Sequence, residues 1–136
     1  MKNFKPIIMK KIFLLFAVLG VSLASAQTVY KCFQSDDNPK LALMAKSVNG
    51  TIVSVKYKGQ KQAIPLTNGH QKAADIDLNE LYLEKYNGKI TGRYTFTNTP
   101  NDETLQYERM KDGKFYYFTL SPSSYVNNAF RRTPCW

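Results

Sequence analysis

Short segments in which apolar and polar residues alternate, separated by turn residues, set the strongest limit on the fold of this chain. Asn49-Gly50 and Asn87-Gly88 each separate two such segments. Asn-Gly is the preferred pair for a two-residue type I′ hairpin, because both positions need a positive φ. Further tight turns are indicated at residues 58–59 and 112–113. Four hairpins that are local in sequence predict an antiparallel meander and not a βαβ fold.

Nine segments have the length and spacing that are typical of strands in a β-sandwich or β-barrel. We expect them to form an all-β fold, a small antiparallel β-barrel of about eight strands, within residues 27–136. The nine segments are residues 29–33, 41–47, 51–58, 62–66, 80–86, 89–97, 104–110, 114–120 and 125–131.

The segment 89–97 has the clearest alternation, with Ile90, Gly92, Tyr94 and Phe96 on one face. A period of two with one apolar face predicts a half-buried strand. A glycine on the inner face indicates a bend or a close approach of another group to the backbone.

Alternation in 51–58 places Val53 and Val55 on one face and Ile52 on the other. The segment 114–120 is apolar on both faces, which predicts a central strand or one whose outer aromatic residues another segment covers. Residues 67–79 lack alternation, and we expect a long loop or a short helical excursion across one barrel end.

Residues 1–26 have the three parts of a secretory signal peptide. Four lysines precede an apolar run over residues 12–23, and Ala24-Ser25-Ala26 is a small-x-small cleavage site. The apolar run is about 12 residues long, which is too short to span a bilayer. We therefore expect a periplasmic or secreted protein of residues 27–136 that has no membrane attachment after cleavage. Translation starts at either Met1 or Met9.

Cys32 and Cys135 are the two cysteines of the chain, and they lie near the two ends of the expected barrel domain. In an oxidising compartment, two cysteines in these places predict one structural disulfide. Neither cysteine belongs to a CxxC motif or has a histidine beside it, so we expect neither a metal site nor a reactive thiol pair.

The chain has 19 basic and 10 acidic residues. Four of the basic residues lie in residues 1–26, so 15 basic and 10 acidic residues remain, a balance of +5. A positive balance favours acidic partners such as polysaccharide. Export argues against intracellular nucleic acid as a partner.

Sequence motifs of enzymes are missing: the chain has no Gly-rich phosphate loop, no GxSxG and no HExxH. His70 is the only histidine. The string that starts at Asp75 resembles a calcium loop, but Glu80 stands where an EF-hand needs Gly, and Tyr86 where it needs Glu. We expect a non-enzymatic protein with no cofactor and no metal. Glu80 and Glu84 would share one face of a strand about 13 Å apart, too far for a retaining glycosidase pair.

Two groups of residues are candidates for binding an unknown ligand or protein. Basic groups that are interleaved with aromatic residues can bind sugars or single strands of nucleic acid. The first group is Arg93, Tyr94, Arg109 and Tyr116. The second group lies in the segment 67–79 and consists of His70, Asp75 and Asp77.

The chain also resembles a known family in the order of several features. Tyr30-Lys31-Cys32 opens the domain, a strand pair follows with Val53, Val55, Tyr57, Lys58-Gly59 and Leu66, and Cys135 closes it. This order resembles the plan of the periplasmic and membrane-bound inhibitors of c-type lysozyme, which are small antiparallel β-barrels with a cysteine near each end.

That family places a loop with a Ser-Gly-x-x-Tyr-type motif in the lysozyme active site, and this chain has no such string. Residues 67–79, with Asp75, Asp77 and Glu80, are the nearest counterpart. The balance of +5 opposes binding of a basic lysozyme.

We expect a secreted or periplasmic binding protein that uses the barrel mouth or the segment 67–79. A lysozyme-inhibitor-like protein and a lipocalin-like carrier of small molecules are the two alternatives. The carrier alternative lacks the Gly-x-Trp opening that lipocalins have, since Lys31 and Phe33 stand in that region.

Overall fold

The two Asn-Gly pairs form the hairpin turns that the sequence predicts. Asn49 and Gly50 both have positive φ angles, and so do Asn87 and Gly88. This backbone conformation is that of a type I′ turn, whose twist matches the twist of the strands on either side. Each turn joins two strands that pair in antiparallel register directly beside it.

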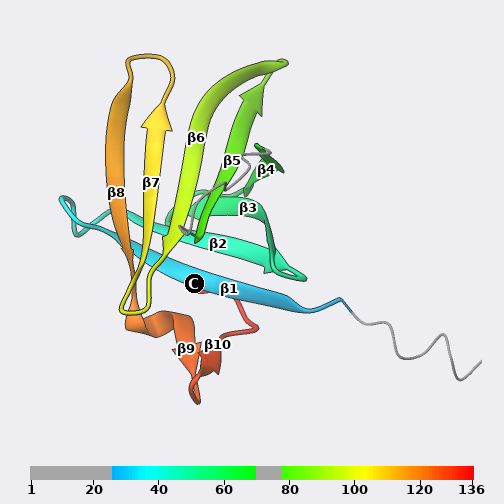
Figure 1. The fold of residues 1–136 in the computed structure, drawn as a ribbon, viewed down its shortest axis with the longest axis vertical. Helices are drawn as coiled ribbons and strands as arrows, with labels where there is room; N and C mark the ends of the chain where they lie inside the picture. Colours follow the sequence, from blue (N-terminus) through cyan, green and yellow to red (C-terminus); the bar gives the residue numbers. More distant parts are fainter. Residues whose placement is uncertain (1–25, 70–77) are drawn as a thin grey trace, which may run out of the picture.

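The computed structural model describes residues 26–69 and 78–136, and it is a closed barrel of eight antiparallel strands in sequence order (Figure 1). The predicted all-β barrel is therefore confirmed. The predicted signal peptide covers residues 1–26. Residues 1–25 lie outside the described residues, and Ala26 is the first residue described. The strands are β1 (Thr28–Ser35), β2 (Ala42–Val48), β3 (Thr51–Tyr57), β4 (Ile64–Asn68), β5 (Leu78–Tyr86), β6 (Lys89–Asn98), β7 (Glu103–Arg109) and β8 (Lys114–Leu120).

A β-bulge in β3 changes which of its residues point inward. Ser54 pairs with Lys46 and Ile52 pairs with Ser47, so Val53 is an extra residue without a counterpart in β2. An extra residue shifts the alternation of the bulged strand. Ile52 is therefore buried and Val53 is 36 % exposed, and the faces predicted for these two residues are wrong.

A second bulge lies in β6. Gly92 pairs with Glu84 and Ile90 pairs with Lys85, which leaves Thr91 without a counterpart in β5. Ile90 is 42 % exposed as a result, contrary to the prediction that it belongs to the inner face. The other three residues predicted on that face are buried.

Aromatic side chains fill the middle of the barrel. The rings of Phe33 and Phe96 meet edge to face with centroids 5.8 Å apart, and those of Tyr82 and Phe96 do so at 5.7 Å. Full burial of such a side chain contributes about 1.5–3 kcal/mol. The rest of this core is Leu43, Ala45, Ile52, Val55, Leu66, Tyr94, Leu105 and Phe118.

The outer face of β8 carries exposed aromatic residues. Phe115 is 43 % exposed and Tyr117 is 47 % exposed, and their rings stack with centroids 6.4 Å apart. β8 has hydrogen-bonded neighbours on both edges, β7 and β1. Of the two predicted alternatives, the central strand is confirmed. No covering segment is needed to explain the pattern, and the chain after β8 packs over β1 instead.

Residues 121–136 follow the outside of β1, and the C-terminus lies beside that strand (Figure 1). They contain a short 3-10 helix, η1 (Pro122–Ser124), and two short strands, β9 (Tyr125–Val126) and β10 (Ala129–Phe130). The single strand predicted over 125–131 is wrong. Asn127 and Asn128 both have positive φ and form a two-residue turn between β9 and β10, because asparagine tolerates the left-handed region.

The predicted Cys32–Cys135 disulfide is confirmed, and it fixes this C-terminal segment to β1. The Ser124 hydroxyl also holds the segment there. It accepts a hydrogen bond from the Cys32 N–H at 2.8 Å and donates one to the Cys32 carbonyl at 2.9 Å. The Tyr30 N–H donates to the Arg131 carbonyl at 2.9 Å.

Replacement of both cysteines by serine should lower the free energy of unfolding by roughly 2–4 kcal/mol, because the disulfide closes a loop of about 100 residues. Trp136, the only tryptophan, follows Cys135 directly. In the variant without the disulfide, the change in Trp136 fluorescence that reports release of the C-terminal segment should occur at a lower denaturant concentration than unfolding of the barrel. Denaturant titrations of both proteins measure this. Two thiols that react with an alkylating agent in the non-reduced protein would contradict it.

Candidate functional site

Three of the sequence-predicted residues come together at one end of the barrel. Tyr94, Arg109 and Tyr116 line a pocket of about 310 Å³, which we call the tyrosine pocket. It lies where β3 ends and β8 begins. Arg93 does not join them, because it alternates with Tyr94 along β6 and is exposed on the outer face. The remaining lining residues are Leu41, Tyr57, Ile64, Glu84, Tyr107 and Phe118.

The second predicted group, His70, Asp75 and Asp77, lies outside the described residues. The residues on either side of this segment are described, because β4 ends at Asn68 and β5 begins at Leu78. Residues 67, 68, 78 and 79, which we expected to lie outside the strands, are therefore strand residues. Both of these strand ends lie at the opposite end of the barrel from the tyrosine pocket, since that pocket adjoins the start of β4.

Three tyrosine rings form a row across the tyrosine pocket. Tyr94, Tyr107 and Tyr116 stand opposite one another on β6, β7 and β8. The rings of Tyr94 and Tyr107 stack with centroids 4.5 Å apart, and those of Tyr107 and Tyr116 with centroids 6.0 Å apart. Because each ring stands on a hydrogen-bonded strand of the closed barrel, the row is held in place before any ligand binds.

Gly92 makes room for the middle ring of this row. A Cβ atom at this position would lie against Cε2 of Tyr107, much closer than van der Waals contact allows. The predicted close approach to the Gly92 backbone is therefore confirmed, and the group that approaches is the Tyr107 ring.

Hydroxyl groups surround the carboxylate of Glu84. Its Oε1 accepts hydrogen bonds from Thr91 at 2.9 Å and from Tyr107 at 3.3 Å. Its Oε2 accepts one from Tyr94 at 3.2 Å. The Tyr94 and Tyr57 hydroxyls are 3.0 Å apart. Because the single Tyr94 proton goes to Glu84, Tyr57 is the donor to Tyr94.

Burial keeps these phenols protonated. It raises the pKa of Tyr57 to about 12. Burial is also the largest cause that raises the pKa of Tyr94, followed by the neighbouring Tyr57. For Tyr107, burial and then the charge of Glu84 raise the pKa. At neutral pH these side chains are therefore hydrogen-bond donors and not bases.

Cationic groups lie at the outer edge of the tyrosine pocket. The Arg109 guanidinium lies 5.6 Å from the centroid of the Tyr116 ring, and the Lys114 Nζ lies 5.2 Å from it. Arg109 also binds both carboxylate oxygens of Asp112, at 2.6 and 3.1 Å. The hydrogen bond from Arg109 lowers the pKa of Asp112 to about 2.

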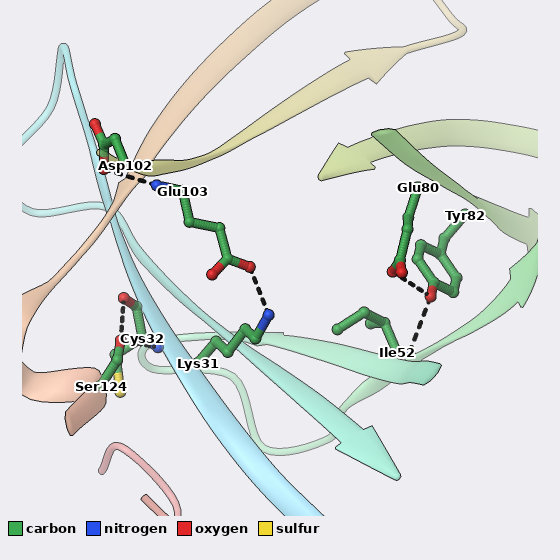
Figure 2. A network of polar contacts seen from close by, with 8 residues as sticks. All are labelled: Lys31, Cys32, Ile52, Glu80, Tyr82, Asp102, Glu103 and Ser124. Carbon is green, nitrogen blue, oxygen red and sulfur yellow. Dashed lines mark hydrogen bonds and ion pairs between the residues drawn. The ribbon is translucent and has the colours of Figure 1, made fainter. Parts of the chain in front are cut away.

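The opposite end of the barrel has a different polar arrangement (Figure 2). A pocket of about 390 Å³ there is lined in part by Lys31, Glu80 and Phe130. Figure 2 shows Lys31 reaching Glu103, and the Nζ–Oε1 distance is 2.6 Å. Lys31 also lies 4.8 Å from the Phe130 ring centroid. Glu80 accepts a hydrogen bond from Tyr82 at 2.8 Å and is exposed to solvent, whereas Glu84 is partly buried.

Glu84 and Tyr57 are residues of the tyrosine pocket that we did not predict from the sequence as binding residues. Glu80, Tyr82 and Glu84 lie on one face of β5, and Tyr82 is buried in the core. A glutamate in the inward register of an alternating strand was the available signal. The shared face predicted for Glu80 and Glu84 is confirmed, but the two line different pockets.

No family model, curated protein or solved structure matches the chain. The resemblance to inhibitors of c-type lysozyme therefore stays a prediction. Within residues 26–69 and 78–136, there is no cluster of three or more side chains that could hold a metal ion. No helix in the same part of the chain is long and apolar enough to cross a membrane.

Gly92→Ala should destabilise the barrel by about 1–3 kcal/mol, as overpacking does, and should displace the Tyr107 ring. The same substitution in a Tyr107→Ala background should cost much less, because the clash is then gone. A double-mutant cycle of unfolding free energies measures this coupling. Additive effects of the two substitutions would show that the ring does not need the glycine.

The tyrosines should make stability fall in alkaline solution. Their folded pKa values are raised above the usual value of about 10, so their contribution is fully present below pH 10 and is lost as pH rises from there. For Tyr57 the loss extends to about pH 12. Urea unfolding from pH 8 to 12 measures the decline, which should be smaller in Tyr57→Phe. Equal slopes in the two proteins would contradict this assignment.

Proposed function

We propose that this chain is an exported, non-enzymatic binding protein that takes a small ligand in the tyrosine pocket. The observation that carries the proposal is the lining of that pocket, in which apolar and aromatic side chains surround one carboxylate. Pockets of roughly 300–1,000 Å³, mostly apolar with few polar groups, are typical of small-molecule sites. The volume of about 310 Å³ suits a small molecule.

The filled core supports binding at the barrel mouth over enclosure of a ligand in the centre. Phe33, Phe96 and Phe118 are each at most 4 % exposed in the middle of the barrel. A lipocalin-like carrier that encloses its ligand needs that space. The ligand of this barrel would instead contact the tyrosine row from the open end.

The protonation state of the pocket supports binding over catalysis. Tyrosines with raised pKa values are poor bases and poor nucleophiles near neutral pH. Glu84 accepts three hydroxyl donors, which orients it as a fixed acceptor. The disulfide between Cys32 and Cys135 supports export, since such bonds persist in oxidising compartments.

A matched pair of substitutions tests the location of binding. Leu41→Trp should fill the tyrosine pocket, whereas Val29→Trp should fill the pocket at the other end, which Val29 lines. Cells express residues 1–136, and the exported protein is purified. It is then screened by ligand-observed NMR against small neutral, anionic and cationic compounds. We expect compounds that bind the wild type and Val29→Trp and that bind Leu41→Trp at least tenfold more weakly.

Binding that survives Leu41→Trp, or no binding of any compound, would refute the tyrosine pocket as the ligand site. Thermal unfolding of both variants shows whether each is folded. The mass of the exported chain should correspond to an N-terminus at Gln27, and a protein retained in the cytoplasm would refute export. The same preparation, assayed against a c-type lysozyme, tests the family resemblance independently.

A further inference from the structure

The carboxylate of Glu84 lacks a cationic partner within the described residues. The ion pairs of this part of the chain are Lys31–Glu103 and Arg109–Asp112. Glu84 instead accepts three hydrogen bonds from neutral hydroxyl groups. These bonds orient the carboxylate but leave its negative charge uncompensated. A partly buried charge without a counterion favours a ligand of the opposite sign.

The walls of the tyrosine pocket are also suited to a cation. Four phenol rings line it, those of Tyr57, Tyr94, Tyr107 and Tyr116. The face of an aromatic ring is negative and attracts ammonium and guanidinium groups within about 6 Å of the ring centroid. Tyr116 already does so at the outer edge, where two cations of this chain lie over its ring.

We propose that the ligand of the tyrosine pocket is a small organic cation whose ammonium group lies against the tyrosine row and beside Glu84. This inference rests on the proposed function and names its ligand class. The pocket volume of about 310 Å³ accommodates a headgroup-sized molecule. Both a quaternary and a primary ammonium compound have the required charge.

An anionic ligand fits the pocket less well, although Arg109 lines it. Arg109 is bound by both oxygens of Asp112, so this pair carries no net charge. An anion that entered further would approach Glu84 and be repelled by it. Lys114 remains at the outer edge, where it can meet an anionic substituent of a ligand whose ammonium group points inward.

Glu84→Gln removes the charge with little change of shape. The amide oxygen of the new side chain can accept the hydrogen bonds of Thr91 and Tyr107. The amide nitrogen can donate to the Tyr94 hydroxyl, and Tyr94 then donates to Tyr57, which reverses the direction of that chain of hydrogen bonds. The hydroxyl network is therefore satisfied in the variant. Glu108→Gln is the matched control, because Glu108 lies opposite the outward-facing Arg93.

The experiment compares choline, ethanolamine and 3,3-dimethylbutan-1-ol, which is the neutral carbon isostere of choline. Binding to the exported chain is followed by NMR titration. We expect choline, ethanolamine or both to bind at least about tenfold more tightly than the neutral isostere, as a desolvated cation–π contact and a carboxylate require. Glu84→Gln should remove this preference, and Glu108→Gln should retain it.

A second pair of variants tests the rings without touching the carboxylate. Tyr116→Leu keeps apolar surface but removes a π face, so it should weaken ammonium binding several-fold and leave the isostere almost unaffected. Tyr117→Leu, on the exposed outer face of the same strand, should change neither. Thermal unfolding confirms that each variant is folded.

The outcomes separate the two proposals. Equal binding of choline and its isostere, or an ammonium preference that survives Glu84→Gln, overturns the organic cation as ligand and leaves the tyrosine pocket as a binding site. Preference for anionic compounds in the wider screen does the same. Failure of every compound of every charge to bind overturns both the ligand class and the proposed function.

Discussion

The structure depends on how β1 closes the barrel. β1 pairs with β2 along almost its whole length, but only Phe33–Ser35 pair with β8. The part of β1 before Phe33 is held by the chain after β8 instead. The contacts are the Cys32–Cys135 disulfide, the two hydrogen bonds between Ser124 and Cys32, and the hydrogen bond from Tyr30 to Arg131. A barrel removes exposed strand edges only when it is closed. The C-terminal segment therefore covers the part of β1 that does not pair with β8.

Closure gives the barrel two ends with different chemistry. At one end, Lys31 and Glu103 form an ion pair that is largely shielded from solvent, so the charges satisfy each other within the chain. At the other end, Glu84 is surrounded by hydroxyl groups. Both carboxylates lie on the inner face of the same barrel. Glu80 at the first end also has no cationic partner, but it is exposed to solvent, whereas Glu84 is partly buried. A partly buried carboxylate gains more from a charged ligand than an exposed one does, which is why we place function at the end that holds Glu84.

Local irregularities in the strands shape the tyrosine pocket. The bulge at Thr91 turns Ile90 outward and brings the Thr91 hydroxyl to Glu84. The missing side chain of Gly92 lets the Tyr107 ring lie against the β6 backbone. Bulges and inner-face glycines are the usual means by which a sheet is curved into a barrel. In this barrel the same residues that curve the sheet also position the groups that line the pocket.

The amino-acid sequence by itself determined the turns, the strands and the disulfide. Asn49-Gly50 and Asn87-Gly88 fixed two hairpins because their φ preferences are local. Short segments between turn residues predicted the eight barrel strands, with β4 placed two residues too early. The tertiary structure decided the rest. Tyr107 reaches Glu84 across 23 residues of sequence, and Ile52 turns inward only because a bulge shifts its strand. Strand register and barrel closure set these contacts, and both depend on pairing between segments far apart in the chain.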